Sequence, residues 1–454
     1  PTRWAPAPTA APAEAALSGA PGLIIAAPGS GCGKTTVTLG LLRHFHRSGI
    51  RVAPFKVGPD YIDPGFHAAA CGCASVNLDA WALRSDTFAA LASSVAADAE
   101  LVVGEGVMGL FDGAPDGTGS TADVSRRTGW PIVLIVDAAA QGASAAAVVH
   151  GFSSFQDDVS VAGVVFNRVS SKTHCRILNE ATAPLGIPVL GNIPRTPDLA
   201  LPERHLGLVQ ASEQDGLAEL LDAAADLVAA HLDIDRLRAI ARPSTIGTTD
   251  AAEVMTPLGG RIALARDDAF RFAYPHVLDS WRRAGAEIVP FSPLAGEAPD
   301  GAADAIYLPG GYPELHAGRL AANMAFLGGL RSAAARDAAI HGECGGYMVL
   351  GEGLIDAEGA RHAMAGLLPL ETSFAERRLH LGYRAVRLVA KGILGVAGTG
   401  FRGHEFHYAT TVREGSADPL FEAEDARGTH LGQVGRRLGR TAGSFIHLID
   451  RAEG

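Results

Sequence analysis

A glycine-rich segment near the start of the chain has the residues of a phosphate-binding loop. Residues 29–36 have the sequence GSGCGKTT, directly after the apolar run LIIAAP and before a helix-like stretch. In this context backbone N–H groups and the helix N-terminus cradle phosphates, Lys34 reaches the terminal phosphates, and the Thr35 hydroxyl can bind Mg²⁺. Pro28 stands at the first glycine position of the usual pattern. The residues expected to bind ATP here are Gly31, Gly33, Lys34, Thr35 and Thr36.

Three carboxylates follow the next strand-like runs. Asp60 and Asp63 stand in KVGPDYIDP, and Glu105 ends the run ELVVGE. Mg-ATP needs oxygen ligands beyond Thr35, and an acidic residue at the carboxyl end of a parallel strand lies where such sheets bind ligands. The alternatives are an Asx turn beside the neighbouring prolines for either aspartate, and a solvated strand end for Glu105. The predicted Mg²⁺ ligands are Thr35, Asp60, Asp63 and Glu105.

Weaker candidates lie elsewhere in the chain. Asn167 in GVVFNRV can pair with adenine through two hydrogen bonds, and Arg195 and Arg204 can bind anions. Each of these, taken alone, is more often an ordinary loop residue. Residues 71–73 form a C-G-C pair without a second pair at ligand spacing, so a structural zinc site has little support.

A second reactive centre is predicted around Cys344. This residue lies in the run GECGG between a strand-like and a helix-like segment, a pattern typical of a nucleophile elbow. Small neighbours permit the strained turn, and a helix N-terminus is expected to lower the pKa of the thiol; the alternative is a buried core cysteine. The backbone N–H groups of Gly311, in LPGGY, and of Gly345 can hold an oxyanion. His447, at the end of GSFIH, can supply the base.

The choice of His447 as base is not settled by residue chemistry, because the chain has 16 histidines. His404 and His407 in RGHEFHY are rivals. Their H-x-x-H spacing around Glu405 also suggests a metal site, but the sequence indicates no third ligand.

Two α/β domains must position these motifs. From residue 22, short β-branched runs alternate with helix-like stretches, as expected for parallel strands covered by helices. Residues 242–260 are rich in Thr, Pro and Gly and lack a period, so we predict a linker there. The alternation then restarts. We expect an α/β protein with parallel-sheet domains at 22–241 and 261–454 and a disordered Ala/Pro-rich tail at 1–21.

The composition also limits the number of domains, the possible partners and the cellular compartment. With 454 residues, 47% of them hydrophobic, the chain can form two or three cores. A formal net charge of −11 disfavours sequence-independent binding of nucleic acid, which depends on neutralising phosphates. No apolar run approaches the roughly 20 residues of a membrane span, and the five scattered cysteines fit a reduced compartment. We therefore expect a cytoplasmic protein with no nucleic-acid or membrane partner.

With these motifs assembled, the chain resembles the cobyrinic acid / hydrogenobyrinic acid a,c-diamide synthase family, from about residue 22 to its C-terminus. The resemblance lies in the runs KVGPDYIDPGFH, EGVMGLFDG, LPGGYPELHA, HGECGGYMVLG and GHEFHY. That family joins a dethiobiotin-synthetase-like P-loop domain to a class I, triad-type glutamine amidotransferase domain. The residue roles implied by the resemblance are Cys344 as nucleophile, His447 as base, Thr35, Asp60, Asp63 and Glu105 as Mg-ATP contacts, and Tyr61, Ile62 and Asp112 as substrate contacts.

One position departs from the wider amidotransferase pattern. Most triad amidotransferases have a glutamate two residues after the histidine, where this chain has Ile449. The corrinoid branch also lacks that glutamate, so the departure fits the family but leaves the orientation of His447 unexplained.

The resemblance implies a reaction of cobalamin biosynthesis. ATP phosphorylates the c and then the a acetate side chain of a corrin-type macrocycle, and ammonia from glutamine attacks the acyl phosphate. The implied partners are thus a corrinoid polycarboxylate, ATP and glutamine, and a homodimer stays open. Lysine is limited to four positions among the 38 cationic residues. This composition hints at a GC-rich genome and at an aerobic bacterium. Such organisms insert cobalt late, so the metal-free hydrogenobyrinic acid is favoured over its cobalt form.

Three other functions compete with this one. Cobyric acid synthase shares both domains but lacks the DYID run, so it is disfavoured. A nickel-sirohydrochlorin a,c-diamide synthase is closer in motif. A non-catalytic P-loop ATPase switch with a degenerate amidotransferase domain belongs to a different class, and the intact Cys344 and His447 argue against it.

Overall fold

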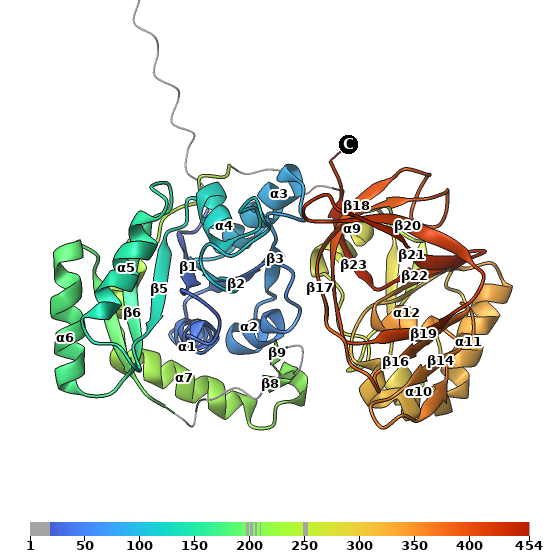
Figure 1. The fold of residues 1–454 in the computed structure, drawn as a ribbon, viewed down its shortest axis with the longest axis horizontal. Coiled ribbons are helices and arrows are strands. Elements are labelled where there is room, and N and C mark those ends of the chain that lie inside the picture. Colours follow the sequence, from blue (N-terminus) through green and yellow to red (C-terminus); the bar gives the residue numbers. More distant parts are fainter. Residues whose placement is uncertain are drawn as a thin grey trace, which may run out of the picture.

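The chain forms two α/β halves that lie side by side, the N-terminal half in blue to green and the C-terminal half in yellow to red (Figure 1). The computed structural model describes residues 19–453 apart from 197–198, 200–202, 205–206, 209 and 248–252, and leaves out the side chains at 203–204, 207–208 and 212. Most of the predicted tail and part of the predicted linker thus lie outside the described residues. Within the described part of the chain, no helix is both long enough and apolar enough to cross a membrane.

The N-terminal half is built on one parallel sheet, with strand order β3-β2-β4-β1-β5-β6-β7. Alternate residues of the central strand enter different cores, Ile24 on one face and Leu23 and Ile25 on the other, so the strand is buried on both faces as predicted. The strands are β1 (Gly22–Ala26), β2 (Val52–Val57), β3 (Val76–Leu78), β4 (Leu101–Glu105), β5 (Ile132–Asp137), β6 (Val161–Val169) and β7 (Val189–Pro194). A short hairpin, β8 (Glu203–Arg204) and β9 (Gly207–Leu208), follows.

Helices cover both faces of this sheet (Figure 1). They are α1 (Lys34–Arg47), α2 (Asp63–Cys71), α3 (Ser85–Ala97), α4 (Thr121–Thr128), α5 (Ser144–Ser154), α6 (Lys172–Thr182), α7 (Leu217–His231) and α8 (Ile234–Ile240). Arg242, the first residue of the predicted linker, pairs with Gly22 of β1. The start of that segment therefore packs on the first domain.

The carboxyl ends of β1, β2 and β4 bring the phosphate loop and the acidic residues to one edge of the sheet. The loop joins β1 to α1, whose first residue is Lys34. Gly33 has φ +97°, and a Cβ there would lie 2.2 Å from Asn167 Nδ2. Only glycine fits this turn, which is why the sequence pattern identifies the loop so well.

The C-terminal half has a mixed sheet, not the parallel sheet predicted, although the α/β class is confirmed. Its order is β11-β10-β12-β13-β22-β21-β20-β17-β18-β23. The first five strands are parallel, whereas the later pairs are antiparallel. No helix separates the strands of residues 380–451. Without helical crossovers, consecutive strands pair as antiparallel neighbours.

The elements of this half fall into three groups. The strands of the large sheet are β10 (Arg261–Ala265), β11 (Glu287–Phe291), β12 (Ala305–Leu308), β13 (Ala339–Glu343), β17 (His380–Leu388), β18 (Gly400–His407), β20 (Asp418–Asp425), β21 (His430–Leu438), β22 (Thr441–Ser444) and β23 (Ile446–Arg451). A smaller sheet holds β14 (Gly353–Ile355), β15 (Arg361–Ala363), β16 (Leu370–Ser373) and β19 (Thr410–Glu414). The helices are α9 (Pro275–Arg283), α10 (Ala317–Ala322), α11 (Met324–Ala335) and α12 (Gly345–Leu350).

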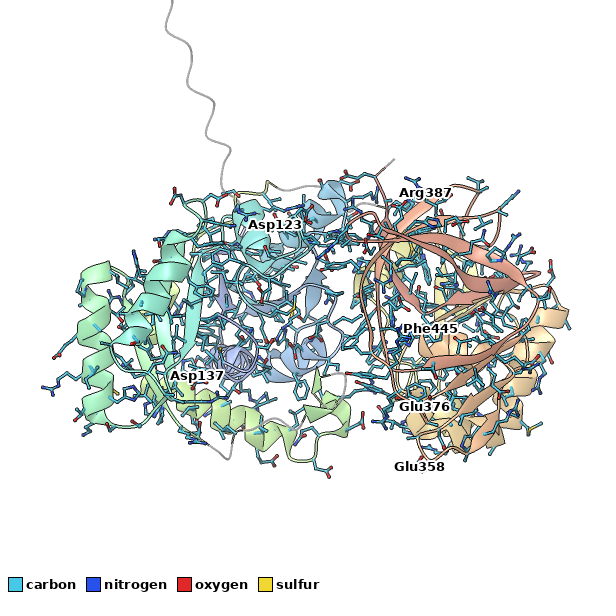
Figure 2. The ribbon with its side chains drawn as sticks, in the orientation of Figure 1. Asp123, Asp137, Glu358, Glu376, Arg387 and Phe445 are labelled. Carbon is cyan, nitrogen blue, oxygen red and sulfur yellow. The ribbon has the colours of Figure 1, made fainter. Side chains whose placement is uncertain are left out.

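The last six strands of the large sheet curl back on themselves. Phe445, labelled in the C-terminal half in Figure 2, is the only residue between β22 and β23, yet β21, β20, β17 and β18 lie between these two strands in the sheet. The curl brings β23 beside β13. His447 of β23 is thereby placed next to the turn that follows β13.

Polar and aromatic contacts join the two halves, and side chains from both fill the boundary (Figure 2). Arg84, before α3, donates to Asp450 of β23 from its backbone N–H at 3.0 Å and from Nε at 3.2 Å. The Tyr383 hydroxyl donates to Asp79 at 3.1 Å, and its ring stacks on Trp81 at 4.4 Å. The second domain is thus held against the edge of the first sheet.

Candidate active site

A cavity of about 720 Å³ lies at the carboxyl edge of the N-terminal sheet. It is the place where the sequence predicts Mg-ATP. The predicted residues that line it are Gly31, Gly33, Lys34, Thr35, Thr36, Asp60, Asp63, Glu105 and Asn167. Residues from four separate stretches of sequence therefore converge on one site.

Glu105 is the centre of a buried polar network in this cavity. Its Oε1 accepts a hydrogen bond from the Thr35 hydroxyl at 2.7 Å, and its Oε2 lies 2.8 Å from His67 Nε2. Lys56 Nζ lies 3.2 Å from Oε1. Burial raises the pKa of the carboxyl, but Lys56 and the bonds from His67 and Thr35 lower it by more, so this pKa lies well below its usual value. Glu105 is therefore a carboxylate, as a metal ligand must be.

Lys56 and His67 were not singled out from the sequence. Lys56 Nζ lies 2.5 Å from Asp63 Oδ2 as well, so a single buried lysine bridges two of the predicted metal ligands. His67 lies one helical turn after Asp63 on α2, and that spacing is the one signal that places it near the carboxylates. Burial, and then the neighbouring Asp60, raise the pKa of the Asp63 carboxyl well above its ordinary value. This crowding of carboxylates favours a cation.

Lys34 is held by main-chain carbonyls at the mouth of the phosphate loop. Its Nζ donates to the carbonyl oxygens of Gly29 at 2.9 Å and Met108 at 2.6 Å. Burial, and then Lys56, lower the pKa of Lys34. Met108 has φ +46°, an uncommon conformation for a residue other than glycine, and its side chain is 47% exposed. The turn after β4 is thus strained at the point where it holds Lys34.

Asp60, a predicted Mg²⁺ ligand, and Asn167, a predicted ATP contact, also make hydrogen bonds to the backbone that hold the local loops. Asp60 Oδ1 accepts from the backbone N–H groups of Ile62 at 2.7 Å and Asp63 at 3.1 Å, so the alternative Asx turn is present while Asp60 still lines the cavity. Asn167 Nδ2 donates to the carbonyl of Cys32 at 2.9 Å. Its Oδ1 accepts from the next backbone N–H at 2.9 Å. The Asn167 amide therefore braces the phosphate loop, and pairing with adenine would require it to exchange both bonds.

The residues predicted to contact the macrocycle lie outside the 720 Å³ cavity. Asp112 is exposed, and its Oδ2 accepts from Gly109 N–H at 2.8 Å in the turn after Glu105. Tyr61 and Ile62 line a separate cavity of about 310 Å³. Arg195 is exposed and lines the larger cavity, whereas the side chain of Arg204 lies outside the described residues.

Cys344 occupies the turn between β13 and α12. Its φ of +46° and ψ of −106° are strained for a residue with a Cβ. The neighbouring glycines are sterically required, since a Cβ at Gly346 would lie 1.9 Å from the Leu308 carbonyl oxygen. The turn geometry of a nucleophile elbow is therefore present.

The expectation that the helix N-terminus lowers the pKa of the Cys344 thiol is wrong for this conformation. The side chain is 3% exposed, and burial, followed by the charge of Glu314, raises its pKa far above the ordinary value. Only the Gly345 N–H acts in the opposite direction. A helix of six residues cannot offset such burial, so the thiol is neutral here.

His447 meets Cys344 across Gly310. A Cβ placed on Gly310 would lie 2.3 Å from His447 Cε1 and 3.3 Å from Cys344 Cβ, so the two side chains converge on this glycine. Burial lowers the pKa of His447 to about 3, so the ring is neutral in this conformation, and the same burial weakens it as a base. Among the described residues, its buried Nδ1 has no hydrogen-bond partner. Ile449, at the position where most triad amidotransferases have a glutamate, is itself buried.

The predicted oxyanion donors lie close together. A Cβ on Gly345 would be 3.2 Å from Gly311 N, so the two glycines lie side by side next to Cys344. Gly311 itself admits no side chain, because its Cβ would lie 2.1 Å from the Ala269 carbonyl oxygen. This arrangement suits an oxyanion formed at a carbonyl that Cys344 attacks.

The rival histidines have other partners. His404 lies opposite His447 on the neighbouring strand, with ring centroids 4.9 Å apart, and its Nδ1 lies 3.1 Å from the Tyr274 hydroxyl. His407 Nε2 lies 3.0 Å from Glu405 Oε1. The contact with Gly310 therefore favours His447 as the base.

A group of possible metal ligands forms around His407 and Glu405, but it does not include His404 of the H-x-x-H pattern. His380 of β17 pairs with His407 of β18, and the ligand atoms of His380, Glu405 and His407 all lie within 4.8 Å of one another. Glu405 Oε2 also accepts a hydrogen bond from Arg384 Nε at 2.8 Å, and Arg384 Nη2 lies 2.8 Å from the same oxygen. His407 and Arg384 thus already satisfy this carboxylate.

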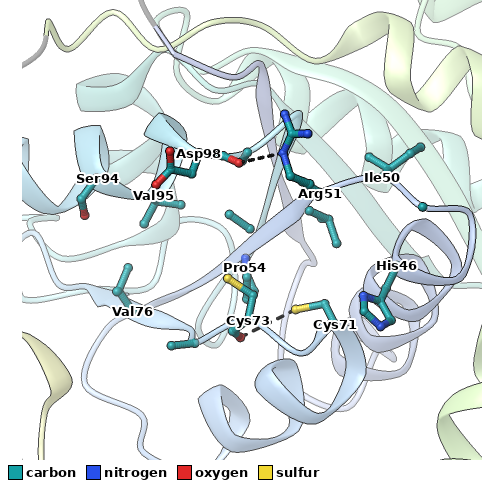
Figure 3. Close-up of a pocket in the computed structure, with 15 residues that line it drawn as sticks. His46, Ile50, Arg51, Pro54, Cys71, Cys73, Val76, Ser94, Val95 and Asp98 are labelled. Carbon is teal, nitrogen blue, oxygen red and sulfur yellow. Dashed lines mark hydrogen bonds between the residues drawn. The ribbon is translucent and has the colours of Figure 1, made fainter.

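Cys71 and Cys73 line a cavity of about 550 Å³ away from both centres (Figure 3). Cys71 Sγ donates to the His67 carbonyl at 3.2 Å, and burial raises its pKa to about 11. Among the described residues, Cys71 and Cys73 belong to no group of three His, Cys, Asp or Glu side chains whose ligand atoms lie within 4.8 Å of one another. The structure adds nothing in favour of zinc at Cys71 and Cys73.

Comparison with known proteins identifies both domains. Residues 23–209 match the CobQ/CobB/MinD/ParA nucleotide binding domain, and residues 261–453 match the CobB/CobQ-like glutamine amidotransferase domain. Together with the site geometry, these matches define a glutamine-dependent amide-forming ligase with a nucleotide-binding domain. A phosphate cavity and a cysteine elbow on separate sheets are what such an enzyme requires.

Curated relatives cover almost the whole chain. The hydrogenobyrinate a,c-diamide synthase of Brucella abortus is 56% identical over 431 residues, which are 94% of this chain and 98% of that protein. The enzymes of the same name from Rhodobacter capsulatus and Rhizobium meliloti are 54% and 52% identical, over 95% of this chain and 99% and 100% of those proteins. The chain belongs to the hydrogenobyrinate a,c-diamide synthase family.

Solved structures match less closely. Chloroplast FtsY from Physcomitrella patens has a TM-score of 0.31 at 18% identity, over 46% of this chain and 68% of that one. PurLQS from Thermotoga maritima has a TM-score of 0.29 at 16% identity, over 41% of this chain and 86% of that one. Scores this low carry no argument about function.

Proposed function

We propose that this chain amidates the a and c acetate side chains of hydrogenobyrinate in cobalamin biosynthesis, with ATP as activator and glutamine as nitrogen donor. The choice of hydrogenobyrinate as substrate is supported by the 52–56% identity to relatives named hydrogenobyrinate a,c-diamide synthase, which match over almost their full length. The geometry supports the chemistry, because a phosphate cavity and a cysteine elbow occupy separate domains of one chain. An acyl phosphate formed in the first domain would be attacked by ammonia released in the second.

The donor set of the ATP cavity fits Mg²⁺. Two neighbouring ligands of an octahedral Mg²⁺ with bonds of 2.0–2.1 Å lie about 2.9 Å apart. Thr35 Oγ1 and Glu105 Oε1 are separated by 2.7 Å, so a cation can replace their hydrogen bond with little movement. Asp60 and Asp63 line the same cavity. Bound Mg²⁺ would screen the charge of the phosphates during transfer.

In the first half-reaction the chain's own residues bind and orient the nucleotide. The N–H groups of the phosphate loop cradle the phosphates at the start of α1. Lys34, now held by two carbonyls, reaches the γ-phosphate and stabilises the charge that builds up as the phosphoryl group moves to the side-chain carboxylate.

In the second half-reaction Cys344 attacks the amide carbon of glutamine. His447 takes the thiol proton and returns it to the leaving ammonia, while the Gly311 and Gly345 N–H groups hold the oxyanion. Water then hydrolyses the thioester to glutamate. The ammonia meets the acyl phosphate, and the amide and inorganic phosphate result. Two rounds on one macrocycle give the a,c-diamide.

The decisive test counts the amides by mass. Purified enzyme is incubated with Mg-ATP, glutamine and either hydrogenobyrinate or its cobalt counterpart, cobyrinate. We expect two amides on the metal-free macrocycle, with one glutamate released per amide formed. Four further amides would indicate cobyric acid synthase chemistry, and a faster reaction with nickel-sirohydrochlorin would reassign the substrate. Glutamate release without any amidated product would contradict the proposal.

A further inference from the structure

The orientation of His447 has no explanation in the sequence motifs. A triad acid would normally accept a hydrogen bond from this ring and fix its tautomer. Here Nδ1 is buried without a partner among the described residues, and Ile449, at the position of the usual glutamate, is buried in the apolar core. Some other contact must hold the imidazole.

Packing against aromatic rings and a glycine holds it instead, with the Phe272 ring the farthest of the three at 6.4 Å between centroids. The His404 ring stacks on His447 with centroids 4.9 Å apart and planes 14° apart. The Tyr61 ring lies against it with centroids 5.2 Å apart and planes 49° apart. Gly310 leaves room for Cε1. Of these neighbours, Tyr61 belongs to the ATP domain and reaches across the domain boundary.

The second ring is tied to the same ATP-domain loop. The Tyr274 hydroxyl donates to the Pro59 carbonyl at 3.0 Å and lies 3.1 Å from His404 Nδ1. Because the hydroxyl has one proton and gives it to Pro59, His404 Nδ1–H is the donor to the hydroxyl oxygen. A hydrogen-bond chain thus runs from Pro59 through Tyr274 to the ring stacked on His447.

The loop that carries Pro59 and Tyr61 is firmly placed in the first domain. Asn77 Nδ2 donates to the carbonyls of Gly58 at 2.9 Å and Asp60 at 2.7 Å. Asp60 closes its Asx turn, and its side chain faces the ATP cavity. One loop therefore contacts the nucleotide cavity on one side and the amidotransferase base on the other.

We propose that Tyr61 of the ATP domain is a positioning residue for His447, and that its ring and the Pro59–Tyr274–His404 chain replace the missing third residue of the triad. The proposal rests on the proposed function of Cys344 and His447 in glutamine hydrolysis. It assigns Tyr61 to the glutamine half-reaction, whereas the family resemblance implied a contact with the macrocycle. Glutamine hydrolysis then depends on the docking of the ATP-domain loop.

The test compares nitrogen sources in Tyr61→Ala and Tyr61→Phe. Displacement of a catalytic group by about 1 Å can cost on the order of 100-fold in rate. We therefore expect Tyr61→Ala to lower kcat for glutamate release by about 10- to 100-fold, with ammonia-driven amidation within about threefold of wild type. Tyr61→Phe keeps the ring and should stay within about threefold with both nitrogen sources.

A matched control loosens the same boundary elsewhere. Arg84 also crosses the boundary, where its Nε donates to Asp450 of β23 at 3.2 Å, and it belongs neither to the Tyr61 loop nor to the Pro59–Tyr274–His404 chain. Arg84→Ala should therefore keep most of the glutamate release. A comparable loss in this variant would mean that the interface as a whole, and not Tyr61, sets the rate.

The pH profile of glutamate release gives a second readout. Burial is the main cause of the lowered pKa of His447, and loss of the Tyr61 ring would admit water. The pKa should then rise, so the acid limb should move up by about one pH unit in Tyr61→Ala and stay in place in Tyr61→Phe. Other titratable groups near His447 include Cys344, His404, His407, Glu343 and Glu405, and both variants leave them unchanged.

The outcomes separate this proposal from the proposed function. Equal losses with glutamine and with ammonia, or a changed ratio of monoamide to diamide with both, would overturn it and place Tyr61 on the macrocycle. Normal glutamate release by Tyr61→Ala would also overturn it. No glutamate release by the wild-type enzyme would refute the proposed function of Cys344 and His447 instead.

Discussion

Gly310→Ala should damage glutamine hydrolysis selectively. The added methyl carbon would lie 2.3 Å from His447 Cε1 and 3.3 Å from Cys344 Cβ. Non-bonded carbons normally stay about 3.5 Å or more apart, so the imidazole must retreat by about 1 Å. Misplacement on this scale costs on the order of 100-fold when the displaced group carries out the proton transfer. We expect kcat for glutamate release to fall by about that factor.

The assay is glutamate release under saturating glutamine, run beside amidation driven by ammonium salt. Gly310→Ala should keep the ammonia reaction, because the ATP cavity is built by the other domain. Gly301→Ala is the matched control, since a Cβ there meets nothing within 4 Å, and it should behave as wild type. If Gly310→Ala hydrolyses glutamine normally, His447 does not occupy this position during catalysis, and the assignment of the base is wrong.

Three further predictions address the remaining site residues. Cys344→Ser should abolish glutamine-dependent synthesis and leave ammonia-driven synthesis largely intact, as measured by product mass with each nitrogen source; loss of both would refute the division of labour. Lys34→Ala and Glu105→Gln should each lower amidation with either nitrogen source by orders of magnitude, because both act before ammonia is used; near-normal ammonia-driven rates would refute the phosphate-cradle assignment. Asp112→Asn should change the ratio of monoamide to diamide in a time course more than it changes the ATP concentration for half-maximal rate, and the reverse would place that turn on the nucleotide.

The local geometries that the sequence predicted and the structure contains are the phosphate loop and the turn at Cys344. The phosphate loop needs a strand, a glycine turn and a helix in succession, and the elbow at Cys344 needs small residues on either side, so a few consecutive letters specify each geometry. The mixed sheet was missed because the direction of a strand depends on its connections. Short strands without helices between them pair antiparallel, whatever their own composition.

Long-range partners could not be predicted in the same way. His67 meets Glu105 only because α2 packs against β2, the neighbour of β4 in the sheet, and the two residues lie 38 positions apart in the chain. His380 meets His407 only because β17 and β18 pair in one particular register. The family resemblance implies a macrocycle contact for Tyr61, and its contact with His447 lies across a domain boundary that no local pattern encodes.

The two centres differ in how easily their substrates can enter this conformation. The ATP cavity has a volume of about 720 Å³, with Lys34 and the carboxylates on its walls, so a nucleotide can bind without a large rearrangement. Cys344 and His447 are 3% and 1% exposed, and the thiol is neutral. In this conformation the side chains that cover Cys344 must move before glutamine can reach it. The loop that carries Tyr61 contacts both centres. The geometry therefore favours activation of the carboxylate before ammonia is released. That order protects the nitrogen, because free ammonia is mostly protonated at neutral pH and would be lost as a nucleophile without an acceptor waiting.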